Sequence, residues 1–308
     1  MSTNEQRKAG KKTSAGNANR KSASRSSSER GDRISSRSRR RSKEARRRRQ
    51  MRRLIQGILV GLCIGILLFS VWQLARIFLG YHSGDKEYDD LKEQFVLDTP
   101  VLPQEVGDIV PSGEDGEGEQ ALVPMTRIDL DALQEINPEA VGWIEIPDTI
   151  ISYPMLHSTD NSYYLTHTFQ NERNKVGSIF IETANEADFS DLHTIIYGHN
   201  MKNGSMFAGL KNYSSKSYWQ AHPYVYIDLA DGAHCYEIFS CHEAATSDIT
   251  YTIGYAADDT YASFLESLKA SCPYDTGVSV GVEDKVITLS TCTQNGQKRF
   301  VVHAKKVY

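Results

Sequence analysis

One uncharged stretch near the N-terminus limits what the rest of this 308-residue chain can fold into. Residues 54–75 (LIQGILVGLCIGILLFSVWQLA) are 22 consecutive residues without a charge. As a helix they would extend about 33 Å at about 1.5 Å per residue, enough to cross the hydrocarbon core of a bilayer. The run is too long for a signal-peptide core, and no convincing small-residue cleavage site follows it. The sequence therefore predicts an uncleaved transmembrane helix over residues 54–79.

The segment before this span is strongly basic. Residues 1–53 contain 20 Lys and Arg against 4 Asp and Glu, whereas the other 255 residues contain 15 against 35. It has almost no large apolar residues, so we expect a disordered tail. Lys and Arg concentrate on the cytoplasmic side of membrane helices, which predicts a cytoplasmic N-terminus and an extracellular C-terminal part. We interpret the tail as touching anionic membrane lipid; nucleic-acid binding is the less favoured alternative.

An acidic segment follows the predicted span. Residues 80–124 include Pro100, Pro103 and Pro111 and the run GEDGEGE at 113–119, a composition typical of an extended spacer. A short juxtamembrane helix is expected within it, over residues 85–97. The acidic residues lack the spacing of an EF-hand loop. We therefore predict an extracellular stalk here rather than a calcium site.

Residues 125–308 have the pattern of one mainly β domain. Two short helices are expected at its start, one over residues 129–136 and one from Asn137-Pro138 toward Val141. Short apolar runs then alternate with turn residues, which indicates a sandwich or barrel rather than a parallel α/β sheet. The expected strands are residues 142–146, 150–154, 177–181, 194–197, 224–229, 234–242, 286–291 and 299–307.

One longer helix is expected shortly before the last two strands. Its apolar residues follow the spacing of one helix face: Tyr261, Phe264, Leu265, Leu268 and Cys272. Asp258 or Asp259 is suited to cap its start, and Pro273 ends it.

A cysteine follows the first of the last two expected strands, and an arginine begins the second. Asn295-Gly296 between them is the strongest short signal for a type I′ hairpin turn. That turn would pair Cys292 with Arg299, and opposed residues have Cβ atoms about 4.5–5.5 Å apart. A guanidinium at that distance favours a thiolate or holds an oxyanion. A lone cysteine in an apolar strand is more often a core residue, so the pair needs further support.

A histidine supplies that support. Residues 194–207 (TIIYGHNMKNGSMF) run from an apolar strand through Gly198 to His199 and then into a loop. A side chain at such a junction is placed to reach into a cleft. An isolated histidine is more often structural, so His199 indicates chemistry only together with Cys292.

Together these motifs resemble one family, the sortases, and among them class B. The resemblance extends over residues 125–308 and keeps the family's order: INPEAVGWIEIP (136–147), ISYPMLHSTDNSYYL (151–165), GSIF (177–180), YGHNMKNGSMF (197–207) and TLSTC (288–292). It implies a closed β-barrel of about eight strands with N-terminal helices. The long helix before the cysteine strand is similar to class B.

The resemblance also implies a reaction. Sortases are membrane-anchored cysteine transpeptidases of Gram-positive bacteria, which cleave a secreted protein at a C-terminal sorting signal, here NPxTG-like, between Thr and Gly and pass it to an amine. On this sequence Cys292 would be the nucleophile, His199 the general acid and base, and Arg299 the holder of the substrate carbonyl or oxyanion. The implied substrate-binding residues are Tyr197, Ser290, Asn161 and Leu165. No metal or other cofactor is implied.

Several alternatives stay open. The connection from Cys292 to Arg299 is short for the family, which makes Lys298 a rival cation, and Thr293-Gln294 replace an acidic residue sometimes found there. The amine belongs to a peptidoglycan precursor or to a pilin lysine. A catalytically inactive, membrane-anchored binding module is the alternative of another class. A papain-like peptidase would place its cysteine before its histidine, and caspase and L,D-transpeptidase signatures are absent around Cys292.

The remaining cysteines constrain less. Cys235 and Cys241 lie about 20 Å apart on one expected strand, too far for a mutual disulfide. A bond to Cys272 stays open, although buried thiols are the commoner outcome. Metal ligation by these cysteines with His234 or His242 lacks a recognisable spacing.

Overall fold

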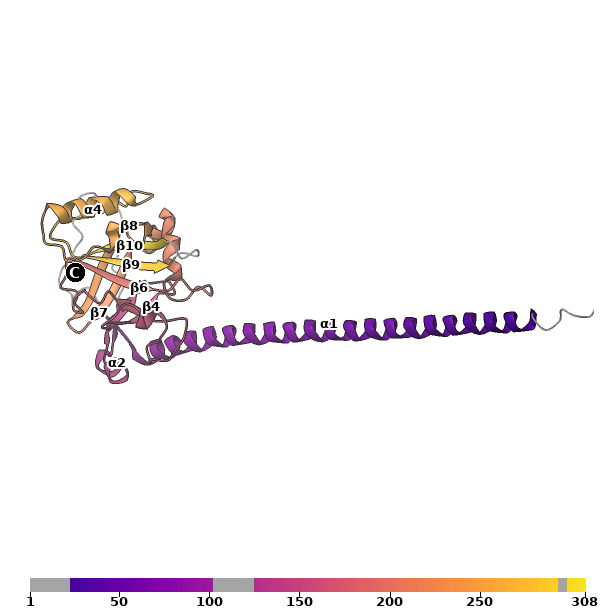
Figure 1. Cartoon of the computed structure of the whole chain (residues 1–308). Helices are drawn as coiled ribbons and strands as arrows, with labels where there is room; N and C mark the ends of the chain where they lie inside the picture. The colour runs from indigo at the N-terminus through magenta and orange to yellow at the C-terminus, as the bar shows by residue number, and fades with distance from the viewer. Residues whose placement is uncertain (1–22, 102–124, 293–297) are drawn as a thin grey trace, which may run out of the picture. The chain divides into compact units, whose positions relative to one another are not determined.

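We describe a computed structural model of the chain (Figure 1). It describes residues 23–101, 125–292 and 298–308. The predicted Asn295-Gly296 turn and the GEDGEGE run lie outside these residues. The chain divides into two units between Leu74 and Ala75, and the second contains the β domain.

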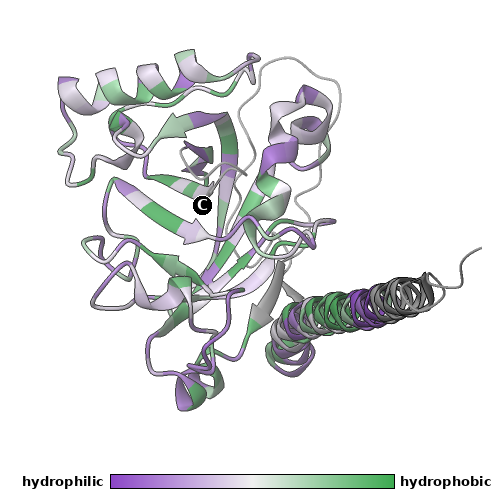
Figure 2. Cartoon of the chain, turned by 45° about the vertical axis from the view of Figure 1, so that its right-hand side comes forward, coloured by the Kyte–Doolittle hydropathy of each residue, from purple (hydrophilic) through white to green (hydrophobic). Residues whose placement is uncertain are grey.

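One helix, α1 (Ala23–Phe95), contains the predicted membrane span. Part of it is long enough and apolar enough to cross a membrane, judged by length and composition. Figure 2 shows this part as a green band along the helix. The helix begins inside the basic segment for which the sequence predicted disorder. Arg, Lys and Ala are good helix formers, so the backbone of residues 23–53 continues the helix of the span.

The C-terminal end of α1 belongs to the β domain. Tyr88, Leu91 and Phe95 are buried in its main hydrophobic core, and the Tyr88 hydroxyl donates a hydrogen bond to the Gly177 carbonyl oxygen at 2.7 Å. The short helix expected over residues 85–97 is thus the last part of α1. It packs against the domain, although the sequence placed it in the spacer of residues 80–124. After it, β1 (Val96–Val101) and β2 (Met125–Ile128) form a small antiparallel sheet.

Eight strands close into a barrel in the order β10-β8-β7-β3-β4-β5-β6-β9, which confirms the predicted fold class. Two neighbouring pairs, β4 with β5 and β6 with β9, are parallel, and the other pairs are antiparallel. The strands are β3 (Ala140–Glu145), β4 (Ser152–Leu156), β5 (Ile179–Ile181), β6 (His193–Gly198), β7 (Tyr224–Leu229), β8 (Gly232–Ala245), β9 (Val286–Cys292) and β10 (Lys298–Lys306).

The first of the two short helices expected before the barrel is present, and the second is not. Helix α2 (Leu130–Ile136) begins after Asp129, whose side chain accepts a hydrogen bond from the Ala132 amide at 3.0 Å. The helix predicted from Asn137-Pro138 was wrong, because β3 begins at Ala140. The Asn137 side-chain amide instead donates to the Phe169 carbonyl at 2.8 Å and to the Tyr164 hydroxyl at 3.0 Å, which fixes the turn into β3.

The predicted long helix is α4 (Asp259–Ser271). Asp258 caps it by accepting hydrogen bonds from the amides of Thr260 and Tyr261. Its apolar face packs against Phe239 of β8 and Val286 of β9. Figure 1 shows α4 beside these strands. The shorter helical segments are η2 (Tyr163–Leu165), η3 (Phe207–Ser214), α3 (Lys216–Ala221) and η4 (Ile249–Tyr251).

Candidate active site

Three strands bring the predicted catalytic positions to one edge of the barrel. Strands β6 and β9 run in parallel, and Gly198 and Thr291 are their last paired residues. His199 directly follows Gly198, and Cys292 directly follows Thr291. Strand β10 runs antiparallel to β9 and places Arg299 opposite Cys292. The cross-strand register predicted from the sequence is therefore confirmed, and positions 199, 292 and 299 meet at the same end of these strands.

His199 is oriented by a backbone contact. Its Nε2 lies 2.7 Å from the carbonyl oxygen of Leu165, the last residue of η2. A carbonyl oxygen only accepts hydrogen bonds, so Nε2 carries the proton and Nδ1 is the nitrogen available for proton transfer. Leu165, predicted as a groove residue, thus contacts His199 through its backbone, and the residue is 38% exposed.

A glycine allows the chain to pass close to His199. Gly177 has φ +61°, and a Cβ atom there would lie 2.5 Å from the Tyr164 carbonyl oxygen and 3.0 Å from His199 Cδ2. Both the backbone conformation and the lack of space exclude other residues. The first residue of the GSIF motif is therefore needed to seat the histidine.

The two candidate cations have different surroundings. Lys298 Nζ donates to Glu243 Oε2 at 3.2 Å. Lys298 thus forms an ion pair with a residue of the neighbouring strand β8. Arg299, the next residue, is half-buried and is the one opposite Cys292. Burial and the Glu182 carboxylate raise the pKa of Tyr197, and the positive charge of Arg299 opposes that rise. Its position opposite Cys292 in the strand register favours Arg299 over Lys298 as the candidate cation.

Two of the predicted substrate-binding residues share one carboxylate. The Tyr197 hydroxyl donates to Glu182 Oε2 at 2.8 Å, and Asn161 Nδ2 donates to Glu182 Oε1 at 2.5 Å. Asn161 Oδ1 in turn accepts the amide of Thr183 at 2.9 Å. Glu182 directly follows β5 and fixes both side chains. The sequence reasoning missed it because no spacing connects residues 161, 182 and 197.

Ser290 contacts a residue that the sequence reasoning also missed. It is buried, and its Oγ lies 2.9 Å from the hydroxyl of Tyr251 in η4. Segment η4 lies between β8 and α4 in the chain. The contact ties the connection before α4 to the cysteine strand, and only the tertiary structure reveals it.

A chain of buried polar groups continues beyond Ser290 along the same face of β9. His193 Nε2 lies 2.7 Å from Thr288 Oγ1, which lies 2.9 Å from His303 Nδ1. His193 Nδ1 lies 2.8 Å from the Thr252 carbonyl oxygen. Burial lowers the pKa of His193 to about 4 and holds the pKa of His303 well below its usual range. Both imidazoles are therefore neutral at pH 7, and they stabilise the strands as uncharged hydrogen-bonding groups.

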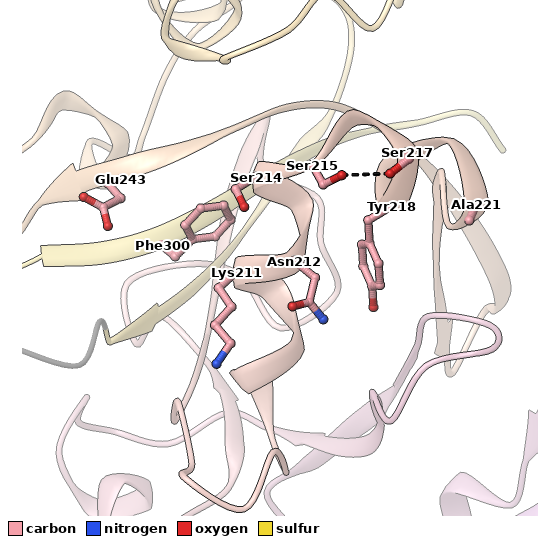
Figure 3. Close-up of a pocket in the computed structure, with 9 residues that line it drawn as sticks. All are labelled: Lys211, Asn212, Ser214, Ser215, Ser217, Tyr218, Ala221, Glu243 and Phe300. Carbon is pink, nitrogen blue, oxygen red and sulfur yellow. Dashed lines mark hydrogen bonds between the residues drawn. The ribbon is translucent and has the colours of Figure 1, made fainter.

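A surface hollow beside η3 and α3 is a separate feature (Figure 3). It contains no cysteine or histidine, and the hydroxyls of Ser215 and Ser217 in it hydrogen-bond to each other at 2.8 Å. Phe300 lines it, and alternation along β10 directs Phe300 to the opposite face from Arg299. The hollow therefore does not extend the candidate active site. Its lining residues are Lys211, Asn212, Ser214, Ser215, Ser217, Tyr218, Ala221, Glu243 and Phe300.

Known proteins identify the family of this chain. Residues 144–307 match the family described as "Sortase domain". Sortase B of Listeria monocytogenes is 35% identical over 229 residues, which are 74% of this chain and 86% of the relative. The chain belongs to the sortase family.

Two similar solved structures are of sortase B. Bacillus anthracis sortase B in complex with AAEK1 is 31% identical with a TM-score of 0.61, and the match covers 75% of this chain and 99% of that one. The Staphylococcus aureus sortase B–substrate complex is 33% identical with a TM-score of 0.55, covering 57% and 83%. The predicted class B membership is confirmed. This sortase is a cysteine transpeptidase with the closed, mixed barrel of its class.

Proposed function

We propose that this sortase cleaves an NPxTG-like sorting signal between Thr and Gly and transfers the protein to an amine of the peptidoglycan precursor. The observation that carries the proposal is the meeting of positions 199, 292 and 299 at one end of β6, β9 and β10. A thiol, an imidazole and a guanidinium at that edge supply the nucleophile, the proton carrier and the oxyanion partner that amide exchange requires.

In the first half-reaction, the Cys292 thiolate attacks the carbonyl carbon of the substrate Thr. The C–S bond forms, the C–N bond to Gly breaks, and His199, as an imidazolium, gives its Nδ1 proton to the leaving amine. Arg299 stabilises the negative charge on the carbonyl oxygen. The product is a thioester between Cys292 and the substrate, which divides one difficult amide exchange into two easier steps.

In the second half-reaction, an acceptor amine attacks the thioester. His199 takes the amine proton, the new C–N bond forms, and the thiolate of Cys292 leaves. The acceptor is then joined to the carboxyl end of the transferred protein. A sortase B structure complexed with triglycine supports an amine acceptor of the oligoglycine type.

The groove beside these residues is the proposed binding site of the sorting signal. Tyr197, Ser290, Asn161 and Leu165 would line it, as the resemblance implies. Glu182 would keep Tyr197 and Asn161 in fixed orientations, and Tyr251 would do the same for Ser290. Polar side chains that are held before substrate arrives lose less conformational entropy on binding.

The proposed placement in the membrane follows the charge distribution. Residues 1–53 would be cytoplasmic, residues 54–79 would span the bilayer, and residues 125–308 would form the extracellular catalytic domain. The end of α1 contributes to the core of that domain. The segment that separates membrane and domain is therefore proposed to lie between residues 79 and 88, and to be shorter than the 80–124 spacer.

The test uses residues 75–308, the compact unit that contains the barrel. An NPxTG peptide with a fluorophore and a quencher is incubated with triglycine, and the products are identified by mass spectrometry. We expect wild type to join the peptide to triglycine, Cys292→Ala to form neither thioester nor product, and the matched variant Cys235→Ala to remain active. Product formation by Cys292→Ala at the wild-type rate would overturn the proposed nucleophile.

The same assay separates the alternatives. Replacing triglycine by a lysine-containing pilin-type peptide tests the alternative that the enzyme polymerises pilins. A pilin-polymerising sortase would form product faster with the lysine amine than with triglycine. If wild type forms no product with any sorting-type peptide and is not labelled by a thiol-reactive substrate mimic, the binding-module reading is correct.

A further inference from the structure

Two cysteines outside the active site lie side by side. Cys241 is a core residue of β8, and Cys272 directly follows the last residue of α4. Cys272 packs against the core cluster that contains Cys241, although the residues are far apart in the sequence, and the pKa of each thiol is shifted by the other. Both cysteines are free in this structure. The sequence left open a disulfide between Cys272 and either Cys235 or Cys241. In the structure Cys235 lies in a separate cluster beside Tyr226, so Cys241 is the possible partner.

The backbone around the two thiols is already held in place. Ser240, next to Cys241, donates from its Oγ to the Leu268 carbonyl oxygen of α4 at 2.5 Å. Thr276, beyond the helix, donates from its Oγ1 to the Phe239 carbonyl oxygen of β8 at 3.0 Å. These bonds join β8 to the end of α4 on both sides of the cysteine pair. The two elements that contain the cysteines are therefore already held together in the reduced protein.

The pKa values of the two thiols are shifted in opposite directions. Hydrogen bonding from the Cys241 thiol lowers the pKa of Cys272 to about 6, whereas the same contact, together with burial, raises the pKa of Cys241. Cys272 is thus mostly thiolate at neutral pH, and the thiolate is the form that attacks disulfides. A reactive thiolate next to a protonated, buried partner is the arrangement of an attacking and a resolving cysteine.

The surrounding hydrogen bonds tolerate the loss of the Cys241 proton. That thiol also lies 3.0 Å from the Tyr213 carbonyl oxygen, which receives a second hydrogen bond, at 2.7 Å, from the Tyr274 hydroxyl. When the proton leaves, Tyr274 still satisfies the carbonyl. A buried acceptor without a hydrogen-bond partner is therefore avoided.

Only one of the two sulfur atoms is near solvent. Cys272 is half-buried and lines a surface hollow with Lys269, Tyr274 and Asp275, whereas Cys241 is fully buried. A small oxidant in the hollow reaches Cys272 first. Cys241 is accessible only through its partner.

We propose that Cys241 and Cys272 form a redox-active pair, oxidised by low-molecular-weight disulfides to an internal disulfide that ties the end of α4 to β8. The Cys272 thiolate attacks one sulfur of the oxidant, forms a mixed disulfide and releases one small thiolate. Cys241 then loses its proton and attacks Cys272 Sγ, which forms the Cys241–Cys272 bond and releases the second small thiol. The protein loses two electrons and the one proton of Cys241, and the oxidant is reduced to one thiol and one thiolate, which takes its proton from water.

The test uses the full-length chain in detergent with Cys292→Ala as background, so its outcome does not depend on the proposed transpeptidation. The protein is treated with oxidised glutathione at neutral pH, quenched with N-ethylmaleimide, digested without reductant and mapped by mass spectrometry. We expect a Cys241–Cys272 cross-linked peptide that dithiothreitol removes. The melting temperature should rise by roughly 5–10 °C on oxidation, because the bond closes a loop of about 30 residues.

Single variants separate the two roles. Cys241→Ser should stop at glutathione on Cys272, and Cys272→Ser should leave Cys241 unmodified. Cys235→Ser, the matched control, should form the cross-link at the rate of the background protein. Iodoacetamide should label Cys272 at least tenfold faster than Cys235 at pH 7. Absence of the cross-linked peptide, stable glutathione on Cys272 in the background protein, or equal modification of Cys241 without Cys272 would each overturn the proposal.

Discussion

The buried histidine at the start of β6 predicts a defined loss of stability in acid. His193 is fully buried, its Nδ1 lies beside the Thr252 carbonyl oxygen and its Nε2 beside Thr288 Oγ1, and burial lowers its pKa from 6.5 to about 4. Between these two pH values the unfolded chain binds a proton that the folded chain does not. The free energy of unfolding therefore falls as the pH falls from about 6.5 to about 4. A shift of this size corresponds to about 3 kcal/mol at most.

The measurement is a series of urea titrations of residues 75–308 between pH 4 and pH 7.5, followed by tryptophan fluorescence. Trp143 is buried and will report unfolding. His193→Gln keeps an amide donor and acceptor but has no proton to titrate in this range. The variant should lose less unfolding free energy than wild type on acidification, with a difference in slope of up to about 1.4 kcal/mol per pH unit.

The difference between the two slopes of unfolding free energy against pH isolates the effect of His193. The carboxylates titrate in both proteins, so their effect cancels. His167, which is near the surface and hydrogen-bonded to the Tyr163 carbonyl oxygen, provides the control. His167→Gln should run parallel to wild type across the series. If His193→Gln also runs parallel to wild type, the imidazole is not held neutral by the fold and the reasoning is wrong.

Three further predictions test the site and its support. Arg299→Gln should lower kcat/KM for an NPxTG peptide by about 10²- to 10³-fold, whereas Lys298→Gln should change it by less than about threefold; the reverse order would make Lys298 the catalytic cation. Glu182→Gln should raise KM more than it lowers kcat, because Tyr197 and Asn161 lose a shared charged acceptor, and an unchanged KM would contradict this. Leu91→Ala should lower the free energy of unfolding of residues 75–308 by about 2–5 kcal/mol in urea titrations, and an effect below about 1 kcal/mol would show that the end of α1 is not part of the core.

The strands and α4 were predictable because local signals agreed with the fold. Alternating apolar residues indicated the barrel strands, and Asp258 with Pro273 marked the ends of α4. The register of the last hairpin followed from the spacing between Cys292 and Arg299, although the turn itself lies outside the described residues. These features depend on residues that are close in the sequence, which is why a single sequence revealed them.

The features that were missed depend on contacts between distant residues. Asn137-Pro138 has the local pattern of a helix start, but the Asn137 amide is used to bind Phe169 and Tyr164 across the domain. Glu182 and Tyr251 belong to no sequence motif. They are recognised only by their hydrogen bonds to the predicted substrate-binding residues. The end of α1 was assigned to a spacer because its composition is acidic, although Tyr88, Leu91 and Phe95 have helical i, i+3, i+7 spacing.

The end of α1 also supports the active-site histidine through a short series of contacts. The Tyr88 hydroxyl donates to the Gly177 carbonyl oxygen and lies 3.0 Å from Ser178 Oγ. Gly177 has no side chain because His199 and the Tyr164 carbonyl occupy that space. The hydrogen bond from Tyr88 therefore fixes the backbone segment against which His199 rests. Since the same helix contains the apolar span, the helix that would anchor the protein also belongs to the structure against which His199 rests.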